Sequence, residues 1–180
     1  MKYLDQGIPV SPAELLDRRE TRANTLEELQ RDFPNHTLLS MKMNIPGPIK
    51  DNDLIRLAFH LSLDEVLLRI KDSVVMDQTQ AATGPEVIIK TSRPAHEIKL
   101  LMIGLEESLP LGRLLDIDVL TEGSALSREA MGLNPRRCFL CDKPARECSR
   151  SAAHPLTALL EAIETLMLQD PSIQQQLPAD

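Results

Sequence analysis

The chain has 180 residues, of which 42% are apolar, and its 27 acidic and 20 basic side chains give a formal net charge of −7. This length and balance predict one domain with an ordinary core and exclude wholesale disorder. The negative charge, together with three Phe, one Tyr and no Trp, counts against nucleic-acid binding, which needs cations and stacking platforms.

The first predicted helix covers about residues 11–32. Ser11, Pro12 and Glu14 are typical of a helix start, with a Ser N-cap, Pro in the first turn and Glu completing a capping box. Its expected apolar stripe consists of Leu15, Leu16, Ala23, Leu26 and Leu29. The basic side chains Arg18, Arg19 and Arg22 form a solvated face or, alternatively, Arg18 and Arg22 reach together into a site.

The middle of the chain alternates between predicted strands and helices. Residues 37–45 show the period-two pattern of a half-buried strand, which ends at Pro46-Gly47-Pro48. A helix is expected over 51–73, as one piece or as two pieces broken near Ser62. A short strand at 86–90 follows the turn at 83–85, and Ser92 is expected to cap a helix that reaches Glu107.

The last part begins with a predicted strand over 113–120. A short helix at 127–131, a Cys- and Arg-rich segment and a helix at 155–169 follow. We expect the polar residues 171–180 to be a frayed tail after a single domain formed by residues 1–170. Helices interleaved irregularly with short strands predict an α+β fold with a small mixed or antiparallel sheet packed with helices.

Asp116 and Asp118 are the sharpest candidate site. Alternate residues of a strand point to the same side, so the two carboxylates would repel each other unless a cation lay between them. Mg²⁺ prefers such oxygen ligands and leaves positions for phosphate oxygens. The preceding Gly112 and Arg113 favour this interpretation, since glycine lets a ligand approach and arginine can hold phosphate. The alternative is a solvated strand face.

Cys138, Cys141, Cys148 and His154 form a second candidate site. We expect a cytoplasmic chain, because the first residues lack the apolar run of a secretory signal and no window could cross a bilayer. Disulfides are not expected in that compartment. The four side chains could close a tetrahedral zinc site; alternatively, they are ordinary thiols whose pKa is lowered by nearby cations.

Basic side chains concentrate around these cysteines. Five of them outnumber the two acidic ones between residues 134 and 154: Arg136, Arg137, Lys143, Arg146 and Arg150. This segment indicates an anionic partner or ligand. Lys99 lies one turn after His96, and it either points toward the Asp116–Asp118 strand or is solvated.

Several motifs together resemble one enzyme family. NIPGP at 44–48, LGRLLDIDV at 111–119, PRRCFLCDKPARECSRSAAH at 135–154 and the helix LLDRRETRANTLEELQ at 15–30 resemble apo-citrate lyase phosphoribosyl-dephospho-CoA transferases. The resemblance extends to about His154. Ala152 and Ala153 depart from it, since basic residues are expected before the histidine.

The resemblance implies a reaction. Such an enzyme takes 2′-(5-triphosphoribosyl)-3′-dephospho-CoA, transfers its phosphoribosyl-dephospho-CoA part to a serine of the citrate lyase acyl carrier protein (γ chain) and releases pyrophosphate. The resemblance therefore implies a nucleotidyltransferase-type enzyme. Its similarity to the nucleotidyltransferase fold is an analogy only. The competing hypothesis is a zinc-stapled module that binds an acidic protein without catalysis.

The resemblance also implies roles for the candidate residues. Asp116 and Asp118 would hold one or two Mg²⁺ ions, and Arg113 would steady the phosphate chain. Gly112 and Lys99 would help to bind the substrate. Arg136 and Arg137 would bind pyrophosphate or the acidic carrier. The Cys/His segment would hold these two arginines through a bound zinc ion or would be a loop without metal. The third carboxylate could be Glu122 or Asp142.

Overall fold

The computed structural model describes residues 1–121 and 124–177. Within these ranges, five strands form one antiparallel sheet in the order β2-β3-β1-β4-β5. The strands are β1 (Thr37–Met43), β2 (Ser73–Ala81), β3 (Gly84–Thr91), β4 (Leu115–Thr121) and β5 (Ser124–Ala125). The predicted α+β fold is confirmed, and the sheet is antiparallel.

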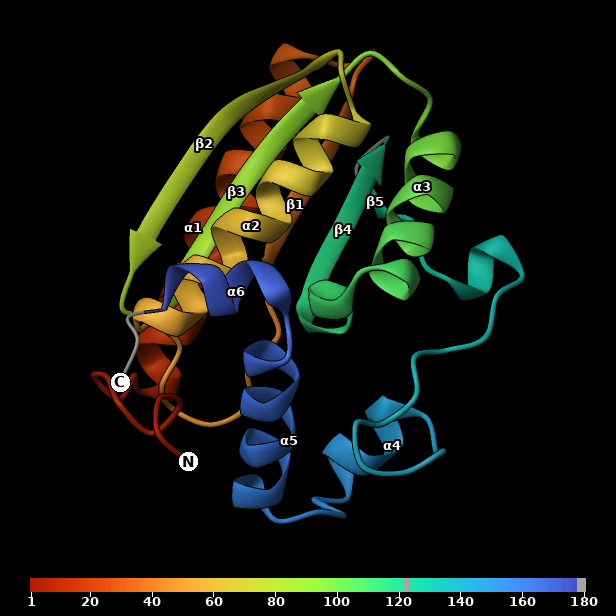
Figure 1. The fold of residues 1–180 in the computed structure, drawn as a ribbon. Coiled ribbons are helices and arrows are strands. Elements are labelled where there is room, and N and C mark those ends of the chain that lie inside the picture. Colours follow the sequence, from red (N-terminus) through yellow and green to blue (C-terminus); the bar gives the residue numbers. More distant parts are fainter. Residues whose placement is uncertain (122–123, 178–180) are drawn as a thin grey trace.

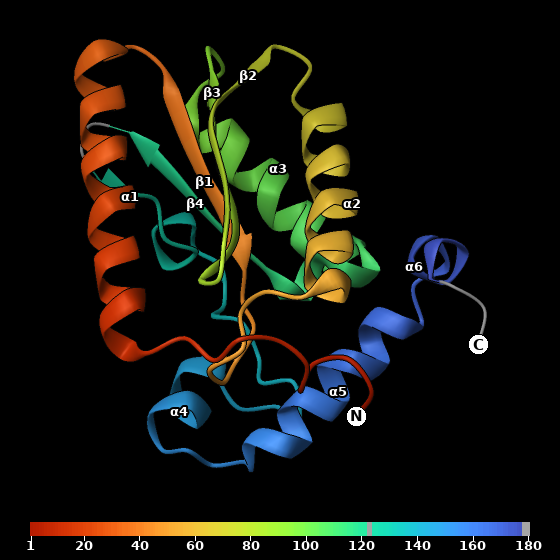
Figure 2. The same ribbon diagram turned by 90° about the vertical axis from the view of Figure 1, so that its left-hand side faces the viewer.

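Helices cover both faces of this sheet. Helix α1 (Pro12–Asp32) lies on one face, while α2 (Asp53–Arg69) and α3 (Ala95–Ser108) lie on the other (Figures 1 and 2). Two further helices, α4 (Ala145–Arg150) and α5 (Leu156–Leu168), lie beyond one end of the sheet, and α6 (Pro171–Gln176) lies beside one end of α2 (Figure 2). No helix in the described ranges is both long and apolar enough to cross a membrane.

The main core lies between the sheet and helices α2 and α3. It contains the alternating apolar residues of β1, β3 and β4, among them Leu39, Met41, Ile89 and Ile117. Burying each such side chain contributes about 1.5–3 kcal/mol. On the other face, Leu26 of α1 packs against Leu38 and Ile88 in a much smaller cluster. The sheet is therefore held mainly from the α2–α3 side.

The predicted start of α1 is confirmed, but its apolar stripe is partly wrong. The Glu14 N–H donates to Ser11 Oγ at 3.2 Å, and the Ser11 N–H donates to Glu14 Oε2 at 2.8 Å, which completes the capping box. Leu16 and Ala23 are exposed, whereas Leu26 is buried. The helix is turned so that its first half presents arginines to the sheet.

The expected helix at 51–73 ends early and is unbroken. Within α2, the Ser62 hydroxyl donates to the Ala58 carbonyl at 2.7 Å, so this serine does not interrupt the helix. The strand that follows, β2, was not predicted from the sequence. It is an edge strand with a register shift between Val75 and Asp77, and its mixed polar residues show no clear alternation.

Three other boundaries differ from the expectation. Ser92 donates to Asp72 at 2.8 Å, and α3 has Pro94 at its N-cap with no side-chain cap. Residues 110–114 form a 3₁₀ turn, so the expected strand at 113–120 begins at Leu115. The expected frayed tail forms α6 over residues 171–176, because Ile173 is fully buried in a second apolar cluster.

Candidate functional site

A row of charged side chains crosses three adjacent strands on the α1 face of the sheet. Lys42 of β1 lies opposite Glu86 of β3 on one side and opposite Asp116 of β4 on the other. Asp118 lies two residues along β4 and points to the same face as Asp116. As expected, the residues of β4 that alternate with them, Leu115, Ile117 and Val119, are buried in the main core.

A cleft of about 380 Å³ lies between the first half of α1 and this row. Its charged lining comprises five basic and three acidic side chains, namely Arg18, Arg19, Arg22, Lys42, Lys50, Glu86, Asp116 and Asp118. The cleft thus has a local excess of cations in a chain with a net charge of −7. Such a cleft favours a polyanionic ligand.

The two aspartates have different surroundings. Burial alone would raise the pKa of Asp116, but the ion pair and hydrogen bond with Lys42 outweigh it and hold this pKa below its ordinary value. Asp116 is therefore ionised at neutral pH. Asp118 is exposed in the same cleft. The pair combines one anchored carboxylate with one that faces the open cleft.

Arginines of α1 enter the cleft from the opposite wall. Arg18 and Arg22 both form ion pairs with Glu86, which is only 5% exposed. Burial lowers the pKa of Arg22, and repulsion from Arg18 lowers it further. Of the two alternatives for this helix, the solvated face is wrong for Arg18 and Arg22, because both side chains are half-buried and line the cleft.

Three lining residues were missed from the sequence. Lys42, Lys50 and Glu86 each stand in a different segment, and only the strand pairing brings Lys42 and Glu86 beside Asp116. Burial lowers the pKa of Lys50, with repulsion from Lys42 as the second cause, and its ammonium group donates to the Ile45 carbonyl. The polar position of Lys42 in an alternating strand was the one available signal.

The other candidate arginines lie elsewhere. Arg113, Arg136 and Arg137 line a second cavity of about 320 Å³ beside the end of α3. Arg113 donates to the Arg137 carbonyl at 2.6 Å, and its guanidinium carbon lies 4.9 Å from the centre of the Phe139 ring. Arg136 donates to a β4 carbonyl at 2.6 Å and pairs with buried Glu106. These contacts attach the cysteine-rich segment to α3 and β4.

Gly112 and Lys99 also lie outside the aspartate cleft. A Cβ at Gly112 would lie 2.5 Å from the Glu106 carbonyl oxygen, so this glycine permits close packing against α3. Lys99 does point toward β4: its Nζ donates to the Ile117 carbonyl at 3.2 Å. It is buried on the α3 side, and this burial lowers its pKa.

Of the two residues expected to supply a third carboxylate, Asp142 is described by the structure and does not line the cleft. Asp142 lies in the cysteine-rich segment, where it is exposed and 3.2 Å from Arg137. Glu122 lies outside the described residues. The third acidic side chain of the cleft is Glu86.

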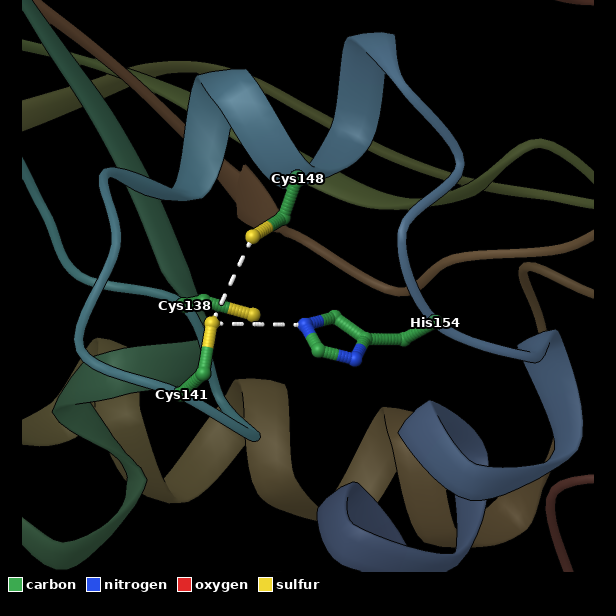
Figure 3. A group of neighbouring side chains, drawn as sticks. All are labelled: Cys138, Cys141, Cys148 and His154. Atoms are coloured by element: carbon green, nitrogen blue, oxygen red, sulfur yellow. Dashed lines mark hydrogen bonds between the residues drawn. The ribbon is translucent and has the colours of Figure 1, made fainter.

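Cys138, Cys141, Cys148 and His154 converge on one point (Figure 3). Their candidate ligand atoms all lie within 4.8 Å of one another. Cys148 comes from α4, while the other three come from the flanking loops. The tertiary structure therefore brings together all four residues of the second candidate site.

Comparisons with known proteins agree on one family. Residues 10–170 match the family model described as apo-citrate lyase phosphoribosyl-dephospho-CoA transferase. A protein from Escherichia coli O1:K1 with this name is 40% identical over 163 residues, which is 88% of each chain. A "probable" transferase of the same name from Streptococcus pyogenes serotype M18 is 36% identical over 167 residues, covering 89% of this chain and 87% of the relative.

Proposed function

The chain belongs to the apo-citrate lyase phosphoribosyl-dephospho-CoA transferase family, and on that premise we propose that it attaches this prosthetic group to the acyl carrier protein of citrate lyase. The donor is 2′-(5-triphosphoribosyl)-3′-dephospho-CoA and the acceptor is a serine of the carrier (γ chain). The serine oxygen bonds to the phosphorus nearest the ribose, and pyrophosphate leaves with the electrons of the broken P–O bond. The serine proton is released. This is a nucleotidyltransferase-type reaction.

The cationic cleft under α1 is the observation that carries this proposal at the level of residues. Transfer of a phosphoryl group needs positioning and charge neutralisation more than covalent help. Arg18, Arg22, Lys42 and Lys50 supply cations from α1, β1 and the loop after it. A cleft of about 380 Å³ suits the triphosphate end of the donor, while the rest extends beyond it.

The donor set of the cleft fits a magnesium ion. Asp116 and Asp118 present carboxylate oxygens to one cavity, and the pKa of Asp116 is lowered, so it offers a charged ligand at neutral pH. Mg²⁺ bound there would neutralise phosphate charge and lower the proton affinity of the attacking serine. Lys42 already pairs with Asp116, so it holds this side chain toward the cleft.

The carrier protein is the partner that this family name implies. Arg137 is the more available of the two neighbouring arginines, with 70% of its side chain exposed. We assign it to contact with an acidic carrier surface, and we assign Arg136 to holding the segment in place. The cytoplasm suits the three free cysteines.

A non-catalytic module that binds an acidic partner is not favoured. The relatives are named transferases and match most of the chain, and the D-x-D pair lines a cleft. A module that only binds would not need that arrangement.

Mass spectrometry of the carrier tests the function. Purified carrier is incubated with this protein, the donor and Mg²⁺, and we expect a mass gain equal to the phosphoribosyl-dephospho-CoA group. An unchanged carrier mass, with donor and carrier shown to be intact, would refute the proposed reaction.

Asp118→Asn tests the role of the carboxylate pair. The change keeps the size of the side chain and removes one charge, so carrier modification should fall on the order of 10²-fold or more. Asp64→Asn, at an exposed position of α2, is the matched control and should transfer normally. Near-normal transfer by Asp118→Asn would contradict the metal-binding role but not the reaction itself.

A further inference from the structure

The segment that follows β4 has almost no hydrophobic core of its own. Among the described residues from 120 to 159, Cys148 alone is buried. Among the described residues from 124 to 155, the regular structure consists of the two-residue strand β5, a 3₁₀ turn at Glu129–Met131, the short helix α4 and one isolated bridge between Arg137 and Pro144. A stretch that buries so little apolar surface cannot offset the conformational entropy lost in ordering it. The arginine contacts to α3 and β4 hold its ends, and a further interaction is needed to order the loops between the cysteines.

Two separations in the cluster of Figure 3 are close to those of a tetrahedral metal site, and all four ligand atoms lie within 4.8 Å of one another. Cys141 Sγ lies 3.5 Å from Cys148 Sγ and 3.4 Å from His154 Nε2. Ligands at the usual zinc–sulfur and zinc–nitrogen lengths at tetrahedral corners lie about 3.5–3.8 Å apart. The observed separations therefore leave room for one ion at the centre.

The backbone around the cluster is shaped to present these atoms. The Leu140 N–H points at Cys138 Sγ at 3.5 Å, and the Cys138 N–H donates to the Lys143 carbonyl at 2.8 Å. Ala152 has φ of +46°, and no other non-glycine residue in the described ranges has positive φ. Such a conformation is costly for alanine, and it lies in the turn that leads from α4 to His154.

We propose that Cys138, Cys141, Cys148 and His154 bind one structural Zn²⁺ ion. Thiolates and an imidazole in tetrahedral array select zinc over the hard cations that prefer oxygen. Four protein ligands complete the coordination and leave no position for substrate, so the ion cross-links the chain. It joins the segment after Arg137 to α4 and to His154, two residues before the start of α5.

A disulfide is the competing use of these thiols. The Cys141 and Cys148 sulfurs lie 3.5 Å apart, well beyond the ~2.05 Å of a covalent bond. Pairing those two would also leave Cys138 and His154 converging on the same point without a reason. A metal accounts for all four side chains.

Metal analysis of untagged full-length protein tests the site without reference to transfer activity. We expect about one zinc per chain in the purified protein, and removal by a chelator should lower the thermal midpoint. The zinc-free reduced protein should take up one Co²⁺ and show the intense sulfur-to-metal absorption of tetrahedral thiolate coordination.

Variants assign the ligands. His154→Ala and Cys148→Ser should lose most of the zinc, whereas His96→Ala, at an exposed histidine of α3, should keep it. If Cys148→Ser fails to fold, His154→Ala still tests the site, provided that its far-UV circular dichroism spectrum is unchanged. The cobalt absorption of this variant should be altered or lost. Purified wild-type protein with under about half an equivalent of zinc, and no cobalt uptake when reduced, would overturn the site. Two oxidised cysteines in place of metal would overturn it in favour of the disulfide.

Discussion

At the scale of single residues, five of the eight charged side chains that line the cleft under α1 form ion pairs with one another. Lys42 pairs with Asp116, while Arg18 and Arg22 pair with Glu86. A buried or half-buried ion alone would be costly, so each of these groups keeps a partner before any ligand arrives. Binding of a triphosphate and a metal ion would exchange these partners, so the ligand would not have to meet a buried charge that had been left unpaired.

Lys42→Met tests how Lys42 sets the ionisation of Asp116. Without the ammonium group, the main interaction that lowers the pKa of Asp116 is lost, while burial still raises it, so this pKa should rise. Asp116 would then become protonated at a higher pH, so the acid limb of the kcat/KM profile should move to higher pH. Lys71→Met, at an exposed position, should leave the limb in place. An unmoved limb in Lys42→Met would contradict this role.

At the scale of elements, the turn between α3 and β4 determines where β4 starts, and therefore where Asp116 and Asp118 lie. Residues 110–114 fold into a 3₁₀ turn packed under the end of α3, and Gly112 is the point of closest approach. A side chain there would meet the carbonyl oxygens of Leu105 and Glu106. The glycine thus acts through packing that places the start of β4.

Gly112→Ala should be destabilising by about 2 kcal/mol or more, because its Cβ would meet backbone that cannot move freely. Gly104→Ala provides a matched control. Gly104 lies exposed in α3, and a Cβ added to it would have no neighbouring atom within 4 Å outside its own helix backbone. Alanine there should stabilise the helix by about 0.5–1 kcal/mol. Urea unfolding measures both; equal effects would refute the packing argument.

At the scale of the whole molecule, a second apolar cluster ties the first residues of the chain to the last helices. Leu4 packs with residues of α2, α5 and α6. Beside it, buried Glu164 of α5 accepts backbone N–H groups of Lys2, Tyr3 and Leu4, at 2.5, 3.0 and 2.8 Å. Burial would raise the pKa of Glu164, but these hydrogen bonds outweigh it and lower the pKa.

Glu164→Gln should therefore be destabilising at neutral pH and much less so in acid. A carboxylate with a lowered pKa in the folded state stabilises it above the ordinary carboxyl pKa, and this contribution is lost as pH falls through the folded-state pKa. We expect the free energy of unfolding of the variant to be lower than that of the wild type by about 1–3 kcal/mol at pH ~7. This difference should become smaller towards pH ~3. Denaturant titrations at several pH values measure this difference in the free energy of unfolding. Glu161→Gln, at an exposed position of the same helix, should show no difference from the wild type. A gap that is independent of pH would contradict the assignment.

Local patterns in the sequence were enough to predict many of the elements. The capping box placed the start of α1, and the alternation along β4 placed Asp116 and Asp118 on one face. The spacing of the cysteines and His154 indicated a shared site, and the motifs indicated the family. These features depend on residues close together in the chain, so periodicity and capping chemistry reveal them.

Contacts between distant segments decided the rest. Strand β2 forms by pairing with β3, although its own residues show no strand pattern. Arg18, Lys42 and Glu86 meet because strand register and the rotation of α1 bring them together, whereas Arg113 and Arg136 are directed to α3 and the cysteine-rich segment. The sequence alone determined which chemistries the chain carries; the tertiary structure decided which of them share a cleft, because pairing and packing act across long separations in the chain.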